Sequence, residues 1–166
     1  MHLAIAPIDK KDDYQNDTGL AGFGAGLRYR PDRYIAMEFA AEFISGTDYM
    51  GRNRTEVPLM VNMLGYLNPR DAAQVYLLAG IGMSTATVKY RSGTETVYDY
   101  FGGQLGLGLE LRVSHPVSLN FDLLGFIRGR TDSKASESPE FVDRDNGRIS
   151  NTSWGGLIRA GVTLYW

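Results

Sequence analysis

Apolar and polar residues alternate with a period of two along most of this chain, in segments that end at turn-forming residues. In the segment 98–113, for example, Leu105 and Leu107 share one face of an extended strand, whereas Gln104 and Glu110 lie on the other. The same pattern predicts strands at about 2–8, 18–30, 34–45, 55–67, 74–88, 98–113, 117–130 and 153–166. No comparable helical periodicity occurs, so the sequence predicts an all-β protein.

The predicted strands are long, and the connections between them alternate in length. Most strands reach about ten residues, and a strand tilted across a bilayer needs roughly 9 to 11. Short connections at 31–33, 68–73 and 114–116 alternate with longer polar ones at 9–17, 46–54, 89–97 and 131–152. In an up-and-down barrel with an even number of strands, all short turns then lie at one rim, as in outer-membrane barrels. We therefore predict a single domain over 1–166, an eight-stranded antiparallel up-and-down transmembrane β-barrel.

The positions of charged residues indicate which strand face meets lipid. The lysines all lie in predicted loops or at a strand end, at Lys10, Lys11, Lys89 and Lys134. A strand face exposed to water normally carries lysine, whereas the polar face of these strands carries glycine, small residues, arginine and carboxylates. We therefore expect the apolar face to point outward to lipid. The alternative is a soluble, lipocalin-like ligand-binding barrel, whose apolar face would point inward.

Several charged residues are predicted to meet inside the barrel. The predicted lumen network comprises Arg28, Glu38, Glu42, Glu110, Arg112, Asp122, Arg128 and Arg159, and Glu56 lies on the same strand face. The interior of an eight-stranded barrel is just wide enough for side chains, and an unpaired charge buried there costs several kcal/mol. We therefore predict arginine–carboxylate pairs, among them Arg159 with Asp122, that plug the lumen and leave no open pore.

Aromatic residues gather near both ends of the predicted strands. Tyr29, Tyr34, Tyr66, Tyr76 and Trp166 lie near the short-turn ends, and Phe43, Tyr49, Tyr90, Tyr98, Tyr100 and Trp154 lie near the long-loop ends. Two such bands are typical of the aromatic girdles at the two interfaces of a membrane. The alternative interpretation is that tyrosine is simply common in β-strands.

Composition narrows the functional classes further. The formal net charge of −2 gives no broad basic surface, so we expect no nucleic-acid partner. The chain has no cysteine and only two histidines, His2 and His115, which excludes a disulfide framework and leaves too few ligands for a thiolate or histidine metal site. We accordingly predict no metal and no cofactor. Because no run of about eighteen apolar residues occurs, a transmembrane helix is excluded.

The N-terminal residues Met1, His2 and Leu3 do not resemble a signal peptide, which needs a basic region and a long apolar region. The protein is therefore either cytosolic or a processed form to which a start methionine was added back. The strand pattern favours the processed form.

Two kinds of stretch resemble ligand-binding loops. The glycine-rich stretches 22–26 and 102–106 resemble dinucleotide loops, but both continue as strands and no helix pattern follows. The stretch 143–147 resembles a calcium loop, but its spacing departs from the EF-hand pattern. We interpret the glycines as strand residues beside inward side chains and 143–147 as a turn.

The sequence contains the residue types of a hydrolase catalytic triad. Such a triad would combine His115, Ser118 and Asp122. His115 precedes Pro116 in a predicted tight turn, however, whereas Ser118 and Asp122 are predicted to point into the lumen. We therefore predict no catalytic residues.

The most specific motif lies in the last eight residues. Arg159, Gly161, Leu164 and Trp166 occupy the polar, glycine, hydrophobic and terminal aromatic positions of a motif that resembles the C-terminal β-signal of outer-membrane barrel proteins. The whole sequence is similar in pattern to the small outer-membrane β-barrel superfamily that includes the transmembrane domain of outer membrane protein A.

This resemblance implies a location in the bacterial outer membrane, with insertion by the barrel-assembly machinery that reads the signal. It implies contact with outer-membrane lipid and lipopolysaccharide, and long loops available to a binding partner. The expected role is non-enzymatic: envelope integrity or surface interaction. The alternative is a lipid-modifying outer-membrane enzyme, which would need serine, histidine and carboxylate together on the lipid-facing surface.

Overall fold

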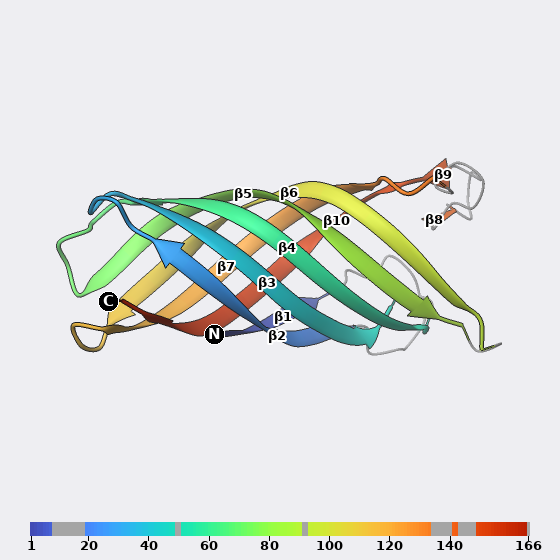
Figure 1. Cartoon of the computed structure of the whole chain (residues 1–166), viewed down its shortest axis with the longest axis horizontal. Helices are drawn as coiled ribbons and strands as arrows, with labels where there is room; N and C mark the ends of the chain where they lie inside the picture. The colour runs from blue at the N-terminus through green and yellow to red at the C-terminus, as the bar shows by residue number, and fades with distance from the viewer. Residues whose placement is uncertain (8–18, 49–50, 91–92, 134–140, 143–148, 166) are drawn as a thin grey trace.

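Eight strands form a closed antiparallel barrel in the computed structural model, which describes residues 1–7, 19–48, 51–90, 93–133, 141–142 and 149–165. The barrel strands are β1 (His2–Pro7), β2 (Gly19–Tyr29), β3 (Ile35–Thr47), β4 (Asn53–Tyr66), β5 (Ala73–Lys89), β6 (Glu95–Arg112), β7 (Val117–Arg130) and β10 (Thr152–Leu164). Each pairs with the next barrel strand, and β1 pairs with β10 to close the ring (Figure 1). A separate two-stranded ladder joins β8 (Phe141–Val142) and β9 (Ile149–Ser150). The described residues contain no helix long and apolar enough to cross a membrane.

The predicted fold class is confirmed. The observed strand ends differ from the predicted ones by at most 3 residues. The connections β2–β3, β4–β5 and β6–β7 lie at one end of the barrel, where β10 also ends, and we call this the short-turn end (Figure 1). The opposite end is the long-loop end.

The loops predicted at 46–54 and 89–97 are strand at both of their ends in the structure. Pairing between β3 and β4 reaches Thr47 and Asn53, and pairing between β5 and β6 reaches Lys89 and Glu95. Near these ends the outward positions are polar, so the hydrophobic alternation fades although the strands continue. Each of the two remaining turns contains a glycine with positive φ, Gly51 at 71° and Gly93 at 85°, a conformation that glycine adopts without steric cost.

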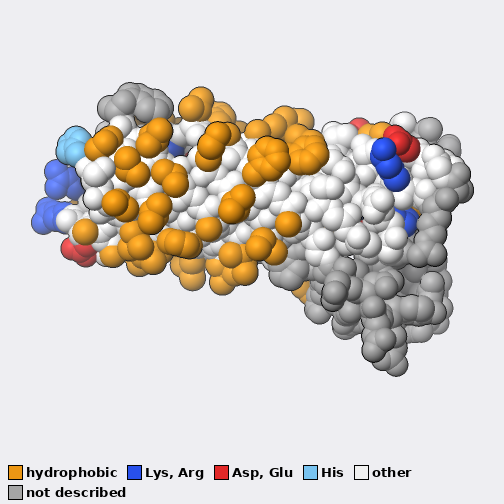
Figure 2. Space-filling view, turned by 90° about the horizontal axis from the view of Figure 1, so that it is seen from below, with side chains coloured by type: hydrophobic (Ala, Val, Ile, Leu, Met, Phe, Trp, Pro, Cys, Tyr) orange, Lys and Arg blue, Asp and Glu red, His pale blue; other side chains and the backbone are white. Residues whose placement is uncertain are grey.

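The outer face of the barrel changes from apolar to polar along its length. Figure 2 shows apolar side chains gathered over the part nearest the short-turn end, with few at the long-loop end. On the polar part, Ser45 Oγ lies 3.2 Å from Thr55 Oγ1, and Thr85 donates a hydrogen bond of 2.8 Å to Asp99. β5 and β6, with 17 and 18 residues, exceed the roughly 9 to 11 needed to cross a bilayer. These strands therefore project beyond the apolar belt.

The orientation of the two strand faces agrees with the prediction. Leu107 on β6 is 53% exposed, whereas Glu110 on the opposite face of the same strand is fully buried. The same contrast holds on β7, where Leu123 is exposed and Asp122 is buried. The soluble, lipocalin-like alternative required the apolar face to point inward, so it is wrong.

Some of the tyrosines predicted for the interfacial girdles lie inside the barrel instead. Tyr66, Tyr76, Tyr98 and Tyr100 are at most 4% exposed. They occupy strand positions that face the lumen, and the prediction had considered only their depth along the strand. The outward positions Tyr29, Tyr34, Phe43 and Trp154 are exposed, Tyr90 is half-buried, and Tyr49 and Trp166 lie outside the described residues.

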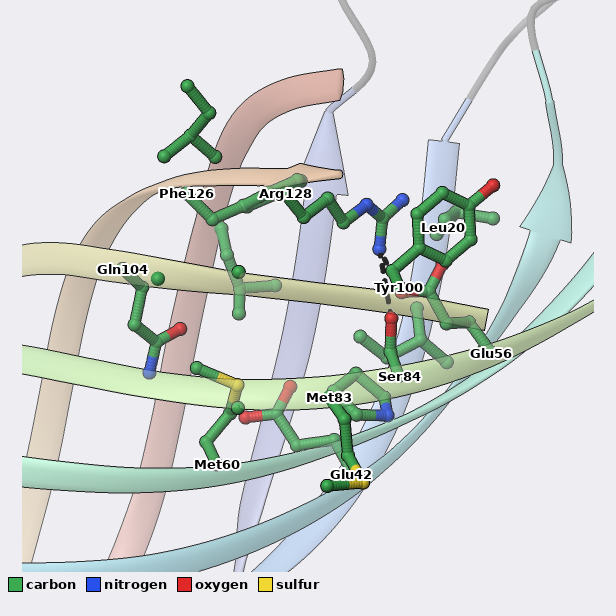
Figure 3. Close-up of a pocket in the computed structure, with 17 residues that line it drawn as sticks. Leu20, Glu42, Glu56, Met60, Met83, Ser84, Tyr100, Gln104, Phe126 and Arg128 are labelled. Carbon is green, nitrogen blue, oxygen red and sulfur yellow. Dashed lines mark hydrogen bonds and ion pairs between the residues drawn. The ribbon is translucent and has the colours of Figure 1, made fainter. Parts of the chain in front are cut away.

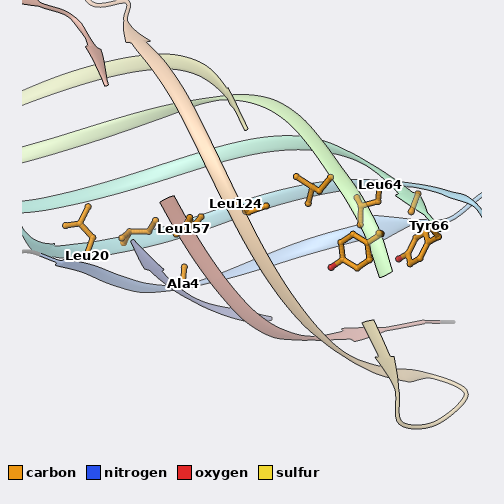
Figure 4. Packing of buried hydrophobic residues seen from close by; sticks show 10 residues of the cluster. Ala4, Leu20, Leu64, Tyr66, Leu124 and Leu157 are labelled. Carbon is orange, nitrogen blue, oxygen red and sulfur yellow. The ribbon is translucent and has the colours of Figure 1, made fainter. Parts of the chain in front are cut away.

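A cluster of apolar side chains also runs along the lumen (Figure 4). It includes Ala4, Leu20, Ile44, Leu64, Leu78, Leu124 and Leu157, with Phe126 packed against them. These side chains share the interior with the buried charged residues, so the interior of this barrel is mixed in character. The charged residues lie in two groups, one toward each end of the barrel.

Candidate functional site

Buried arginines and carboxylates form two groups in the lumen, on strand positions that the period-two alternation turns inward. The first group, the short-turn network, contains Arg28, Arg30, Arg112 and Arg159 with Glu38, Glu42, Glu110 and Asp122. Arginines and carboxylates are equal in number within it. Arg112 lies at the exposed rim of the network, and His2 Nε2 also lies 3.2 Å from Glu42 Oε1. A positively charged or ionisable nitrogen thus faces each carboxylate, as buried charges require.

Near the short turns, the hydrogen bonds of this network converge on Glu110. Its carboxylate is fully buried and accepts hydrogen bonds from the hydroxyls of Tyr66 at 2.7 Å and Tyr165 at 2.8 Å. Ser118 donates a further hydrogen bond at 3.2 Å, and Arg28 Nη1 lies 3.1 Å from the same carboxylate. Protein donors thus replace the water that a buried carboxylate has lost.

Arg159 links opposite sides of the barrel. Its Nη2 lies 2.7 Å from Asp122 Oδ2 and 3.3 Å from Glu38 Oε1, and its Nη1 lies 3.2 Å from Glu42 Oε1. Because the arginine is on β10 and its partners are on β7 and β3, one guanidinium holds three strands. The side chain of Arg159 is 2% exposed, so these carboxylates are what compensates its charge.

Neutral polar side chains complete the hydrogen bonding of the short-turn network. Tyr76 donates to Asp122 Oδ1 at 2.5 Å, and Asn62 donates to Glu38 Oε1 at 3.1 Å. Gln104 in turn donates to Asn62 at 2.7 Å. The network therefore reaches across the lumen through chains of hydrogen bonds, which occupy the space that a pore would need.

The second group, the long-loop network, surrounds Tyr100. Arg54 and Arg128 both pair with Glu56, Arg54 at 3.1 Å. Both guanidiniums also lie over the ring of Tyr100, at 5.4 and 4.5 Å from its centroid. One carboxylate and one aromatic ring thus stabilise two like charges, since a guanidinium is attracted to the face of an aromatic ring.

Further ion pairs extend the long-loop network toward the loops. Arg130 Nη2 lies 2.7 Å from Asp132 Oδ1, and its guanidinium stacks over Tyr98 at 4.6 Å from the ring centroid. Arg52 Nη2 lies 2.6 Å from Asp48 Oδ2 in the β3–β4 turn. The long-loop end of the lumen is therefore filled by arginine and tyrosine side chains.

Arg128 does not belong to the network for which it was predicted. Its partner is Glu56, a residue on the same polar face that the predicted network left out. On β7, Leu124 and Phe126 occupy the inward positions between Asp122 and Arg128. This apolar spacing places Arg128 too far along the strand to share the carboxylates of the short-turn network.

The structure brings most of the predicted lumen residues together. Arg28, Glu38, Glu42, Glu110, Asp122, Arg128 and Arg159 face the interior and form ion pairs. Arg112 lies at the rim, where its side chain is 43% exposed and its Nε is 3.7 Å from Glu110. The prediction missed Arg30, Arg54, Arg130, Tyr66, Tyr76, Asn62 and Gln104 as partners. Arg30, Gln104 and Arg130 alternate in step with Arg28, Glu110 and Arg128 along the same strands, and this alternation is the signal that could have found them. On β4, Arg54, Asn62 and Tyr66 alternate in step with Glu56.

The carboxylates that converge in the described part of the lumen are occupied by an arginine. Glu38, Glu42 and Asp122 converge, but the guanidinium of Arg159 lies between them. Within the described residues, no group of three or more His, Cys, Asp or Glu side chains is placed to hold a metal ion. The calcium-like stretch 143–147 lies outside the described residues.

The hydrolase triad is not assembled. His115 is exposed in the β6–β7 turn, whereas Ser118 is 1% exposed inside the lumen and donates to Glu110. Asp122 is engaged by Arg159 and Tyr76. The three side chains therefore have no common surface on which a lipid could react.

The residues of the predicted assembly signal have different surroundings. Arg159 is buried in the lumen, and Gly161 pairs with His2 across the β1–β10 seam. Leu164 points outward and is 61% exposed, and Trp166 lies outside the described residues. Recognition of this segment by an assembly factor stays a prediction.

Comparisons with known proteins agree with this architecture. A family model described as the outer membrane protein beta-barrel domain matches residues 1–161. Among solved structures, the crystal structure of Neisserial surface protein A (NspA) superposes with a TM-score of 0.73 and 13% sequence identity, over 99% of this chain and 94% of that one. A likeness at this identity concerns the fold alone. No curated protein sequence matches the chain significantly.

Proposed function

Because the chain belongs to the outer membrane protein β-barrel domain family, we propose that it is a non-enzymatic structural and surface protein of the bacterial outer membrane. The observation that carries this proposal is the filled lumen. Ion pairs centred on Arg159 and Glu110 occupy one part of it, and stacked arginines around Tyr100 occupy another. A barrel filled in this way acts through its outer surface and its loops, and not as a conduit.

The surfaces available for such a role are the apolar belt and the long-loop end. The belt contacts outer-membrane lipid and lipopolysaccharide and so strengthens the bilayer around it. The long-loop end carries the connection 131–152 and the projecting strands β3–β6, which we assign to the cell exterior because short turns face the periplasm in bacterial barrels. A binding partner would meet the protein there. The barrel-assembly machinery is the partner during insertion, through the segment that ends at Trp166.

The absence of enzymatic activity is also part of the proposal. It is supported by the separation of exposed His115 from buried Ser118 and Asp122. A lipid-modifying barrel would need such groups together on the lipid-facing surface. The outward side chains around Leu107 and Phe121 are apolar instead.

A deletion strain tests the proposal in three complementation arms: the full chain, a variant in which 131–152 is replaced by a short turn, and an empty vector. We expect the deletion to raise sensitivity to detergents and large antibiotics, and the full chain to restore resistance. Restoration by the short-turn variant would assign the role to the barrel, and failure of that variant to restore would assign it to the loop.

The same strains distinguish a structural role from an enzymatic one. Mass spectrometry of the outer-membrane lipids should give the same acyl-chain pattern with and without the protein. A change in lipid acylation that depends on the full chain would overturn the non-enzymatic proposal. If the deletion leaves the permeability of the outer membrane unchanged and 131–152 is not exposed on intact cells, the structural and surface role is wrong.

A further inference from the structure

The barrel wall contains an interruption between β3 and β4. Pairing is regular on both sides of it, with Ala41 opposite Leu59 and Ile44 opposite Glu56. The two positions between these pairs, Glu42 with Pro58 and Phe43 with Val57, are not paired. On its other side β4 is intact, because Pro58 pairs with Ser84 of β5 and the neighbouring positions pair as well.

Pro58 is the cause of the missing pairing. The backbone N–H of Tyr66 donates to the carbonyl of Tyr34 at 2.7 Å, which shows that even-numbered residues of β4 direct their backbone groups toward β3. Pro58 is one of these residues, and proline has no N–H to donate. The carbonyl of Glu42 therefore lacks the donor that this register would otherwise give it. Proline is rarely found inside a sheet for this reason.

A cavity of about 80 Å³ lies directly inside this gap. Figure 3 shows Glu42 and Met60 on one side of it and Phe126 and Arg128 on the other. Most of its wall is apolar, and Leu157 lines it as well. The acidic side chains at its edge are already paired, Glu42 with Arg159 and Glu56 with Arg128, so the cavity presents no unpaired charge to a guest.

The two charged networks close the cavity along the barrel axis. Toward the long loops, Arg128 bonds to Glu56 and approaches Ser84 Oγ at 3.5 Å. Toward the short turns, Gln104 donates to Asn62 at 2.7 Å. A guest entering from either mouth would have to break ion pairs. The unpaired stretch of wall is the less costly route.

The gap opens on lipid. Phe43 and Val57 flank it on the outer face and are 43% and 41% exposed within the apolar belt. The next outward pair toward the long loops is Ser45 with Thr55, where the outer face becomes polar. The gap therefore lies at the edge of the hydrocarbon layer, where apolar molecules dissolved in the membrane can reach it.

We propose that the Pro58 gap is a lateral entrance through which small uncharged apolar molecules pass from the membrane into the lumen cavity and bind there. The guest has few heavy atoms, because an engineered apolar cavity of roughly 150 Å³ holds benzene or xenon and this one is smaller. Met60 has a flexible side chain that can adapt the wall to different guests. The site is independent of the loops and of the role proposed above.

Xenon is the probe that tests binding. The full chain, refolded in detergent micelles and labelled at its methyl groups, is titrated with xenon pressure and followed by NMR. Saturable shifts are expected at the methyls of Met60, Ile44 and Leu157, which line the cavity. The buried methyls of Leu64 and Leu78, which share the lumen but do not line the cavity, are the internal control.

Filling the cavity should abolish the saturable response. Leu157→Phe is the first variant for this purpose, and Ile44→Phe replaces it if the first does not refold. Shifts that rise linearly with pressure in the unmodified protein would overturn the proposal. So would contacts between these methyls and lipid chains in nanodiscs, because a lipid chain would then occupy the cavity.

The route is tested by restoring the missing donor. Pro58→Val, or Pro58→Ala if the valine variant does not refold, gives Glu42 a backbone N–H partner and should slow xenon exchange by about fivefold, the factor of one net backbone hydrogen bond. Because Pro58 also lines the cavity, exchange rates are compared at equal xenon occupancy. Pro116→Val, in the exposed β6–β7 turn, is the matched control. Exchange as fast in the Pro58 variants as in the unmodified protein would overturn the lateral route.

Discussion

Arg159 on β10 and Asp122 on β7 lie directly opposite each other in the barrel wall, with 2.7 Å between Nη2 and Oδ2. Removing one member of a buried ion pair leaves an uncompensated charge, which costs about 3 to 5 kcal/mol. We therefore expect Arg159→Ala to lower the free energy of unfolding by about this amount in urea titrations of protein refolded into liposomes.

The control and the double variant make this prediction specific. Arg112→Ala removes a rim arginine that is 43% exposed, and its effect should be at most about 1 kcal/mol. Combining Arg159→Ala with Asp122→Asn should recover part of the loss, because one of the stranded carboxylates is then neutral. Additive effects of the two changes would contradict the pairing.

Leu107 tests the depth of the apolar belt. It faces outward on β6 between Leu77 of β5 and Leu123 of β7. Leu107→Arg should lower the free energy of unfolding in liposomes by about 2 to 4 kcal/mol, as for arginine near the bilayer midplane. Thr87→Arg, outward on the polar part of β5, should cost about 0 to 1 kcal/mol. Similar losses of unfolding free energy at both positions would show that the membrane has been assigned to the wrong part of the barrel.

Gly108 tests the packing of the short-turn network. A Cβ at Gly108 would collide with the ring of Tyr76, whose hydroxyl donates to Asp122 at 2.5 Å. Gly108→Ala should therefore destabilise the barrel by about 1 to 3 kcal/mol through overpacking. Gly65→Ala is the matched control, because a Cβ there meets no atom within 4 Å. Tolerance of Gly108→Ala equal to that of the control would show that the Tyr76 ring moves freely.

Electrical measurements test the filled lumen. Protein refolded into planar bilayers should show no stable, porin-sized conductance, because two sets of ion pairs and an apolar cluster occupy the interior. A porin of known conductance in the same bilayers shows that insertion can be detected. Large steady currents from this protein would reopen the case for transport.

Protease treatment of intact cells tests the assigned orientation. We expect cleavage within 131–152, a long polar connection, and slower cleavage near Gly51 and Gly93, where the strands continue almost to the turn. Detection of fragments by mass spectrometry identifies the sites. Cleavage in 68–73 instead would show that the short turns face outward.

Period-two alternation was sufficient to predict the barrel and the lipid-facing side, because on strands such as β6 and β7 every second residue meets hydrocarbon. It failed at the long-loop ends. There the outward residues Ser45, Thr55 and Thr85 lie beyond the apolar belt, so the strands continue without a hydrophobic signal. The length of β5 and β6 could therefore not be predicted from hydrophobicity alone.

The sequence predicted most of the residues of the candidate site but fewer of the ion pairs that they form. The alternation of side chains along each strand identified most of the charged residues that face the lumen. Which arginine meets which carboxylate also depends on the register and the tilt of the strands. Arg128 and Asp122 share a face of β7, yet the apolar Leu124 and Phe126 separate them and direct Arg128 to Glu56. The tyrosines that face the lumen were predicted to lie at the membrane interface, because the prediction considered how far along the strand they lie and not which face of the strand they occupy. The gap at Pro58 depends on which residues of β4 turn their backbone toward β3, which only the register shows.

The seam between β1 and β10 has a consequence for how the barrel forms and opens. Its register runs from His2 to Ile5 on the β1 side, and Met1 and Val162 exchange two further backbone hydrogen bonds. The other barrel strands pair over longer stretches with the strand that follows them. Closing the seam brings together residues near the two ends of the chain, so it carries the largest loop-closure entropy of any contact in the molecule. Among the seams of the barrel, this one has the fewest paired residues in its register and the highest entropic cost, so we expect the ring to open here first. Backbone amides along the seam should be the first in the barrel to exchange with solvent deuterium.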